Sequence, residues 1–382
     1  MIPRAAQRTL RRLARGFPVV LLTGPRQSGK TTLATATFPR KPYVSLENPE
    51  DRRFATEDPK GFLRRFRNGA VVDEAQHCPE LFPYIQTHVD RTGRQGLFVV
   101  TGSQNLLLLS RVSQSLAGRA GRVELLPLAL RELADAGAAP GDADELLFKG
   151  MYPAIHARDV MPAHWYANYV ATYLERDVRQ LANIQDLMVF QRFLRLCAAR
   201  TGQILNVASL AADCGVAQGT ARAWLSVLQA SYLVFLVPPH HQNFGKRLIK
   251  SPKLYFHDTG LAANLVGIES PAHLAIRPER PALFETMVVN EFLKRRWNAG
   301  LPSHLHFWRD NVGTEIDLVM EQDTRLLPVE VKSGSTVNDE FFSGLRKWIK
   351  YAGKRAGAPM LVYGGDETYE RSGIRVMSWR GL

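Results

Sequence analysis

The sequence is poor in cysteine, with only Cys78, Cys197 and Cys214 among 382 residues. Cysteines so few and so scattered exclude a disulfide framework and a cysteine-rich zinc site, and they are typical of a reducing compartment. No apolar run approaches the roughly 18 residues that cross a bilayer. The basic start is not followed by the apolar stretch of a signal peptide. We therefore expect a cytoplasmic protein that makes no membrane contact.

Acidic residues are absent from the first 46 positions, although basic residues are frequent there. Over the whole chain, Lys+Arg 49 and Asp+Glu 36 give a formal net charge of +13. An excess of this size indicates a polyanionic partner such as DNA, and a merely soluble basic surface is the alternative. With 45% hydrophobic and 22% charged residues the chain is globular, and its length predicts two or three domains.

The stretch GPRQSGKT at residues 24–31 fits the phosphate-binding pattern G-x-x-x-x-G-K-[ST]. It follows an apolar strand and precedes a segment, residues 31–38, that we expect to be helical. This order leaves several backbone N–H groups pointing into one concavity, which binds phosphate. Lys30 adds a charge near the β- and γ-phosphates, and the Thr31 hydroxyl can ligate Mg²⁺. The residues predicted to bind ATP are Gly24, Pro25, Arg26, Gln27, Ser28, Gly29, Lys30, Thr31, Thr32 and Asp73.

A second apolar strand, residues 70–73, ends in Asp73-Glu74 and resembles a Walker B element. An aspartate at the carboxyl end of a buried strand can hold Mg²⁺ through its water shell. The next carboxylate, Glu74, is placed to polarise the water that attacks the γ-phosphate. We therefore expect Asp73 to be a metal ligand and Glu74 to be the catalytic base.

Two further segments supply candidate catalytic residues. Ser103 follows a strand at residues 97–101, and we expect it to position the attacking water, with Thr101 and Gln104 as the next candidates. Capping of the next helix by Ser103 is the alternative and does not exclude this role. The stretch SLAGRAGR at residues 115–122 contains Arg119 and Arg122. Such an arginine can stabilise the γ-phosphate in its own chain or in a neighbouring subunit of a homo-oligomer, and an ordinary salt bridge is the alternative.

Four stretches resemble, in order and spacing, the P-loop domain of a widespread prokaryotic group of AAA-type ATPases: GPRQSGKTTL, VVDEAQ, TGSQNLLLL and SLAGRAGRVELLPL. The TYLERDV segment and the far C-terminus are similar to the same group, so the resemblance covers essentially the whole chain. It implies a parallel sheet with helices on both faces and the hydrolysis of ATP. It does not imply a known biological task.

Residues 187–237 show the order helix, helix, turn, helix, strand, which predicts a winged helix-turn-helix with its recognition helix at residues 218–228. Between residues 187 and 257 the only acid is Asp213. Such a surface is expected to contact DNA phosphates with little sequence preference, and docking of a protein is the alternative. The basic residues of this segment are Arg192, Arg195, Arg200, Arg222, Lys246, Arg247, Lys250 and Lys253, of which the last four fall where the wing is expected.

Near the C-terminus, Asp317 is followed after twelve residues by Glu330-Val331-Lys332. Period-2 alternation puts Glu330 and Lys332 on one face of a strand, next to the hairpin strand that carries Asp317. This pattern resembles the PD-(D/E)XK nucleases. The resemblance implies that Asp317 and Glu330 hold Mg²⁺, that Lys332 activates the attacking water and that the helix acid Glu285 completes the metal shell. Many domains of this fold use their acids for folding or recognition alone, so cleavage is left open.

The sequence thus predicts an α/β protein of three domains. Residues 1–160 are expected to form the P-loop ATPase, residues 161–275 a helical and winged-helix domain, and residues 276–382 a small restriction-endonuclease-like α/β domain. The leading hypothesis is a DNA-processing protein in which ATP and Mg²⁺ control DNA binding, with Mg²⁺-dependent cleavage by the C-terminal acids. The second hypothesis is a nucleotide-dependent switch whose inactive nuclease-like domain binds a protein partner.

Overall fold

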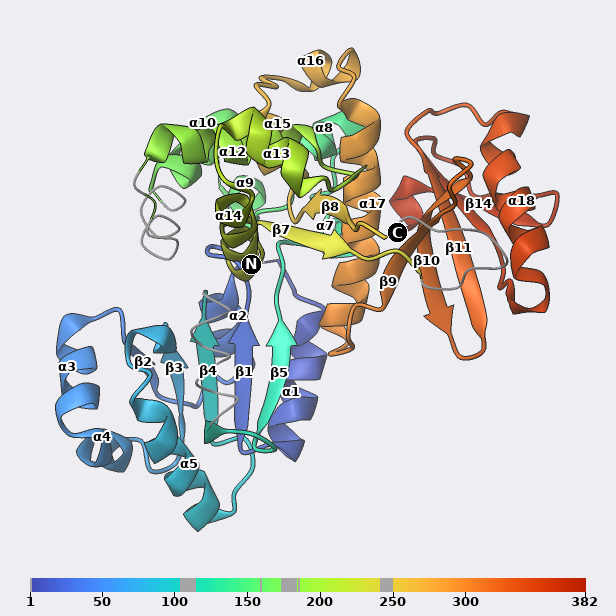
Figure 1. Ribbon diagram of the computed structural model, residues 1–382. Helices are drawn as coiled ribbons and strands as arrows, with labels where there is room; N and C mark the ends of the chain where they lie inside the picture. Colours follow the sequence, from blue (N-terminus) through green and yellow to red (C-terminus); the bar gives the residue numbers. More distant parts are fainter. Residues whose placement is uncertain (1, 104–114, 159, 173–183, 185, 241–249) are drawn as a thin grey trace. The chain divides into compact units, whose positions relative to one another are not determined.

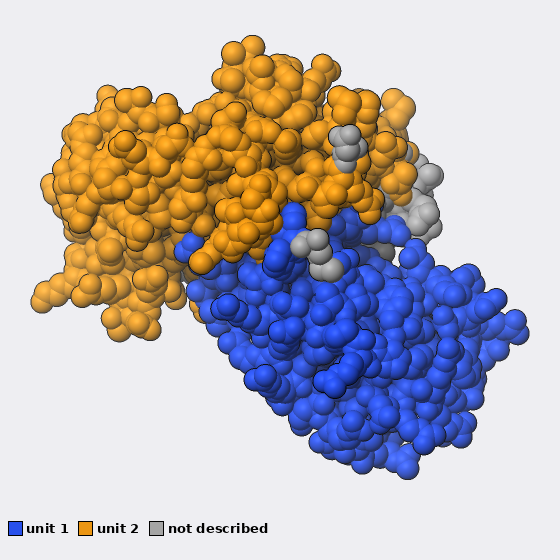
Figure 2. Space-filling model, turned by 180° about the vertical axis from the view of Figure 1, so that it is seen from behind, with its two compact units in different colours: residues 1–128, 230–232, 294–302 blue, residues 129–229, 233–293, 303–382 orange. Residues whose placement is uncertain are grey.

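The computed structural model describes residues 2–103, 115–158, 160–172, 184, 186–240 and 250–382, and they fall into two units (Figures 1 and 2). Unit 1 comprises Met1–Leu128, Ala230–Tyr232 and Lys294–Pro302, and unit 2 comprises Ala129–Gln229, Leu233–Leu293 and Ser303–Leu382. Unit 2 holds both a helical part and a C-terminal sheet. The predicted domain boundaries after residues 160 and 275 stay a prediction.

Unit 1 is built on a parallel sheet in the order β2-β3-β4-β1-β5. Its strands are β1 (Val19–Thr23), β2 (Tyr43–Ser45), β3 (Ala70–Asp73), β4 (Phe98–Gly102) and β5 (Ala120–Glu124). β1, β3 and β4 are apolar and buried along their whole length, as expected for parallel strands that are covered on both faces. The strand of the phosphate loop, β1, and the strand that ends in Asp73, β3, are separated by β4.

Helices cover both faces of this sheet, which confirms the predicted arrangement (Figure 1). Alternate side chains of β1 point to opposite faces: Val19 and Leu21 pack into the core formed with α4 and α5, and Val20 and Leu22 into the core formed with α1 and α2. The helices of this unit are α1 (Ala6–Gly16), α2 (Lys30–Thr37), α3 (Pro49–Glu57), α4 (Pro59–Arg65) and α5 (Leu81–Thr92).

Unit 2 contains a helical part that includes a small antiparallel sheet. Its helices are α7 (Leu130–Asp135), α8 (Ala143–Lys149), α9 (Pro153–Ala157), α10 (Pro162–Tyr169), α12 (Leu187–Ala199), α13 (Val207–Cys214), α14 (Gln218–Ala230), α15 (Thr259–Leu265) and α16 (Pro271–Ala275). The sheet has the order β6-β8-β7, from β6 (Gln203–Ile204), β7 (Val234–Val237) and β8 (Lys253–Phe256). Phe190 and Phe193 of α12 pack edge-on against Trp224 of α14, which fixes these two helices against each other.

The C-terminal part of unit 2 is a mixed sheet in the order β13-β14-β12-β11-β10-β9. The strands are β9 (Leu305–Arg309), β10 (Glu315–Gln322), β11 (Arg325–Lys332), β12 (Met360–Tyr363), β13 (Tyr369–Arg371) and β14 (Ile374–Ser378). α17 (Arg280–Asn298) precedes the sheet, and α18 (Ser343–Ala352) joins β11 to the parallel strand β12. Trp348 of α18 is fully buried in one cluster with Trp308 of β9, so this helix covers one face.

Short 3₁₀ helices are also present. They are η1 (Ala75–His77), η3 (Asp339–Phe342), η4 (Gly353–Arg355) and η5 (Trp379–Gly381). Within the described ranges, no helix has both the length and the apolar character that a membrane span requires.

Phe98 provides a test of the sheet core in unit 1. Its side chain is fully buried on β4, so Phe98→Ala is expected to lower the free energy of unfolding by about 3–5 kcal/mol, because it leaves a cavity in the sheet. Tyr84→Ala, at a position that is 36% exposed on α5, is the control and is expected to change stability by less than about 1 kcal/mol. Chemical denaturation measures both, and equal losses would contradict the packing described.

Candidate functional site

The loop between β1 and α2 has the geometry of a phosphate-binding loop. Gln27 and Gly29 have φ angles of 62° and 91°, in the left-handed region, which turns the backbone sharply into the helix. A Cβ atom at Gly24 would lie 2.1 Å from the carbonyl oxygen of Leu125, so only glycine fits there. The buried Ser28 hydroxyl has no hydrogen-bond partner among the described residues. A free donor inside this loop fits an anionic ligand.

Lys30 begins α2, and its ammonium is held over the loop. Its Nζ donates hydrogen bonds to the carbonyl oxygens of Gly24 (3.1 Å) and Pro25 (2.8 Å). Burial lowers the pKa of Lys30 to about 8, although the nearby carboxylates of Glu74 and Asp73 raise it in part. A buried ammonium gains from any additional anion, so this position favours a phosphate group.

Asp73 is the residue on which several elements converge. Its carboxylate is buried and accepts hydrogen bonds from Thr31 Oγ1 (2.8 Å), Tyr43 Oη (2.9 Å) and the Thr101 hydroxyl. Burial and the Asp73 charge raise the pKa of Tyr43 to about 12, so this hydroxyl stays a donor. The two residues predicted to bind Mg²⁺ in this site, Thr31 and Asp73, therefore lie in direct contact. Tyr43 was not predicted.

Glu74 follows Asp73 in a left-handed conformation, with φ of 51°. Its Oε2 atom accepts hydrogen bonds from Ser103 Oγ (3.3 Å) and from the side-chain amide of Gln76. The same amide lies 3.4 Å from Ser103 Oγ, so the three side chains form one polar cluster. The structure thus brings together Glu74 and Ser103, as their predicted roles require. Gln76 was missed, although it belongs to the VVDEAQ stretch, and Gln104 lies outside the described residues.

Other predicted nucleotide-site residues lie at the rim of the loop. Arg26 forms an ion pair with Glu47 at 3.3 Å. The side chains of Gln27 and Thr32 are exposed, the latter in the first turn of α2. These side chains are placed to contact the outer part of a ligand, whereas Ser28 and Lys30 are buried.

Arg119 does not lie at the phosphate loop of its own chain. Its carbonyl oxygen accepts a hydrogen bond from Val19, at the amino end of β1, whereas the loop follows the carboxyl end of that strand. Five strand residues span roughly 16 Å. Arg119 instead forms an ion pair with Asp90, 2.6 Å away. The expected role in its own chain is therefore corrected to a salt bridge, and a role in a neighbouring subunit stays a prediction.

Tyr232, which follows α14, lies beside the start of the phosphate loop. Its hydroxyl is 2.8 Å from Thr23 Oγ1, the residue before Gly24, and donates to Glu124 Oε1 at 3.1 Å. The side chain is buried, and the backbone has a φ of 56°. No sequence pattern marked this tyrosine, because more than 200 residues separate it from Thr23.

The predicted C-terminal acids also converge. Leu318 of β10 pairs with Val329 of β11, so Asp317 and Glu330 occupy the next rung of the ladder. The Asp317 carboxylate accepts a hydrogen bond from the backbone N–H of Val331 at 2.9 Å, and Glu330 Oε1 accepts one from Lys332 Nζ at 2.6 Å. Burial, together with the Asp317 charge, raises the pKa of Glu330 above its usual range.

Lys253 occupies the space between these acids. Its Nζ lies 2.9 Å from Glu285 Oε1, 2.5 Å from Glu315 Oε1 and 3.5 Å from Asp317 Oδ1. The hydroxyl of Tyr255, two residues further along β8, also donates to Glu285 at 2.6 Å. The predicted place of Lys253 in a DNA-binding wing is wrong, because the residue is only 3% exposed and cannot contact DNA. Burial lowers the pKa of Lys253, but Tyr255 and the carboxylates of Glu285, Asp317 and Glu315 together outweigh burial and raise it.

These C-terminal residues do not fit a magnesium ion in the arrangement observed. Mg²⁺ needs about six oxygen ligands at roughly 2.0–2.1 Å in an octahedral arrangement. The Lys253 ammonium lies 2.9 Å from Glu285 and 3.5 Å from Asp317, so a cation already lies beside two of the three predicted ligands. In the described part of the chain, no group of three or more His, Cys, Asp or Glu side chains has the geometry of a metal site.

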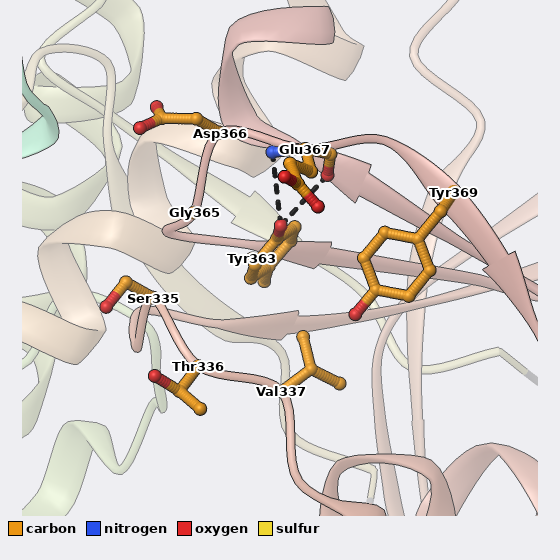
Figure 3. Close-up of a pocket in the computed structure, with 8 residues that line it drawn as sticks. All are labelled: Ser335, Thr336, Val337, Tyr363, Gly365, Asp366, Glu367 and Tyr369. Carbon is orange, nitrogen blue, oxygen red and sulfur yellow. Dashed lines mark hydrogen bonds between the residues drawn. The ribbon is translucent and has the colours of Figure 1, made fainter.

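A hollow of about 530 Å³ adjoins the same sheet (Figure 3). One of its lining residues is Tyr363 of β12, which pairs with Lys332 of the neighbouring strand β11. Its remaining lining residues are Ser335, Thr336, Val337, Gly365, Asp366, Glu367 and Tyr369. The Tyr363 hydroxyl donates to the carbonyl oxygen of Glu367 at 2.9 Å. The ionisable side chains of this hollow are acids and tyrosines, so it does not favour phosphate.

Several predicted DNA-binding residues are accessible. Arg192 and Arg195 of α12, Arg222 of α14 and Lys250 have exposed side chains. Arg200 forms an ion pair with Asp213. Lys246 and Arg247 lie outside the described residues.

The sequence matches three known families of domains. The family described as "AAA domain" matches residues 16–134, which contain the loop, Asp73 and Ser103. A domain of unknown function (DUF8612) matches residues 141–272, and another (DUF4143) matches residues 280–382. The AAA match and the geometry together define the N-terminal part as an AAA-type P-loop ATPase domain.

Two curated relatives are uncharacterized proteins of Mycobacterium bovis and Mycobacterium tuberculosis. Each is 37% identical to this chain over 340 residues, which span 87% of this chain and 74% of the relative. The chain belongs to the same protein family as these two mycobacterial proteins. Among solved structures, the Walker-type ATPase of Pyrococcus abyssi is similar at 15% identity, with a TM-score of 0.44 over 69% of this chain and 96% of that chain. A likeness at that level carries no functional argument.

Glu74→Gln tests the assignment of the catalytic base. The amide keeps the size and the hydrogen bonds of the side chain but accepts no proton, so the turnover number for ATP is expected to fall by roughly 10²–10⁴-fold. Nucleotide affinity, measured by calorimetry, is expected to change little. Glu57→Gln, at an exposed position of α3, is the matched control. Unchanged turnover in Glu74→Gln would show that another group is the base.

Proposed function

We propose that the protein binds and hydrolyses ATP in the site around Lys30 and Asp73, and that this reaction controls its binding to DNA. The observation that carries the proposal is the contact between Thr31 and Asp73, 2.8 Å apart. It joins the phosphate loop to the strand that bears the predicted base. Two motifs that are 42 positions apart in the sequence therefore form one site.

Each residue of this site has a separate role in the proposed phosphoryl transfer. The loop N–H groups and Lys30 bind and orient the phosphates, while Thr31 and Asp73 would hold Mg²⁺, which neutralises the charge that develops on the γ-phosphate. Glu74 accepts a proton from the attacking water. Ser103, hydrogen-bonded to Glu74, fixes the direction of that carboxylate.

The order of elements from α12 to β8 supports a winged helix-turn-helix as the DNA-binding part. Three helices, a short strand between the first two and a terminal hairpin follow in that order. Exposed arginines lie on α12 and on α14, the predicted recognition helix. These cations, together with the net charge of +13, favour contacts with phosphates.

Tyr232 offers a physical route from nucleotide to DNA. It lies two residues after the end of α14, and its hydroxyl contacts Thr23, which precedes the phosphate loop. A shift of the loop on nucleotide binding would change this contact and, through two residues of backbone, the end of the predicted recognition helix. The control of DNA binding by ATP is therefore proposed to pass through this tyrosine.

The second hypothesis, a nucleotide-dependent switch that binds a protein partner, is favoured by Lys253. An ammonium among the C-terminal acids is the arrangement of a salt-bridge cluster, so the predicted cleavage by Asp317, Glu330 and Lys332 lacks a fitting metal position. Convergence of these side chains supports the nuclease-like fold rather than the reaction.

Arg222→Ala tests whether α14 contacts DNA. Loss of one phosphate contact is expected to weaken binding to duplex DNA uniformly across sequences and to lower the salt slope, d log K/d log[salt], by about one unit. Fluorescence anisotropy over a salt series measures both. Arg53→Ala, at an exposed position of α3, is the control. A flat salt response of the wild-type protein would favour protein docking instead of DNA binding.

Tyr232→Phe tests the proposed route of control. The substitution removes the hydroxyl that contacts Thr23 and Glu124 but keeps the buried ring. The difference in DNA affinity with and without a non-hydrolysable ATP analogue is expected to shrink at least severalfold, since a coupling of 1–3 kcal/mol corresponds to roughly 5–150-fold. Tyr84→Phe, at an exposed position of α5, is the matched control. An unchanged difference would exclude the hydroxyl from the coupling.

A further inference from the structure

The C-terminal acids surround a lysine from a distant part of the sequence. Lys253 is the first residue of β8, and its ammonium lies within 3.5 Å of oxygens of Glu285, Glu315 and Asp317. These acids come from α17 and β10, so side chains from three elements meet at one nitrogen. A cation at such a centre balances several carboxylates at once.

The backbone holds Lys253 in this place. β8 is the central strand of its sheet, and Lys253 pairs with Ile204 on one side and with Val237 on the other. Its Nζ also lies 5.7 Å from the centroid of the Phe307 ring, on β9. Because β6 and β7 pair with β8 on both sides, the backbone of Lys253 is held in place, and its side chain reaches the acids from a fixed position.

The charges of the cluster almost balance. The acids are Glu285, Glu315, Asp317 and Glu330, and the cations that contact them are Lys253, Lys332 and Arg309. Lys332 contacts Glu330, and Arg309 contacts Glu315 from a side chain that is 40% exposed. Lys253 is the cation that reaches three of the acids. Without it, several buried carboxylates would repel one another.

We propose that Lys253 is a resident cation that takes the position of the divalent metal in a nuclease-like site, so that the site takes up no Mg²⁺. A divalent ion bound to these carboxylates would lie within a few ångströms of the ammonium, and the repulsion between the two cations opposes its uptake. The acids then serve to bind β8 to α17 and to the C-terminal sheet. This inference does not rest on the proposed function, and its test uses neither ATP nor DNA.

Metal uptake by the full chain tests the proposal, with Mn²⁺ as the probe in titration calorimetry. Each protein is also measured with the additional change Asp317→Asn. Mn²⁺ uptake that this change abolishes is assigned to the C-terminal site. The wild type is expected to show no such uptake, whereas Lys253→Met, which has a similar length and no charge, is expected to show it. Lys250→Met, at an exposed position before β8, is the matched control and should behave like the wild type.

Thermal unfolding supplies a second readout. Lys253→Met leaves the buried acids without their shared cation, so its Tm is expected to fall on the order of 10 °C and to recover when Mn²⁺ is added. Uptake by the wild type that Asp317→Asn abolishes would overturn the proposal. The proposal would also be overturned if Lys253→Met showed no Mn²⁺ uptake that depends on Asp317. If Lys253→Met does not fold, the double variant Lys253→Met/Glu315→Gln, which removes one acid as well, is judged by the same two outcomes.

Discussion

The contacts of one buried carboxylate organise the nucleotide site. Asp73 accepts hydrogen bonds from hydroxyls on α2, β2 and β4, and each of these donors belongs to a different element of unit 1. A buried carboxylate is stable only when such donors satisfy it, so the contacts hold the ends of three elements in fixed positions. Glu74 and Ser103 lie at the same edge of the sheet, because they follow the carboxyl ends of β3 and β4.

The two acidic sites of the chain are stabilised in different ways. In unit 1, neutral hydroxyls satisfy Asp73, and they leave its negative charge available to a cation. In unit 2, the ammonium of Lys253 neutralises the acids directly. Neutral donors allow a metal ion to bind beside the carboxylate, whereas a fixed ammonium competes with it. The carboxylate of the first site therefore stays open to a cation, whereas the acids of the second site already contact one.

Much of the fold could be predicted from local patterns. The apolar runs at β1, β3 and β4 marked strands that are buried on both faces, and the glycine-rich loop marked the start of α2. The bounds of α14, Gln218–Ala230, contain the predicted recognition helix at residues 218–228. Such features depend on residues close in the sequence, where periodicity and turn chemistry operate. The positions of Glu74 and Ser103, the predicted catalytic residues, follow from the same kind of pattern, because each residue directly follows a recognisable strand.

By itself, the sequence determined the class of the N-terminal domain, the residues of its phosphate loop and the positions of the C-terminal acids along their strands. Tertiary structure decided which distant side chains join them. Tyr232 reaches Thr23, Lys253 enters the cluster around Asp317, and Arg119 lies at the end of the sheet away from the loop. The physical reason is that strand order and burial set these contacts. The sequence does not distinguish a basic residue that faces solvent from one that, like Lys253, is buried and balances acids.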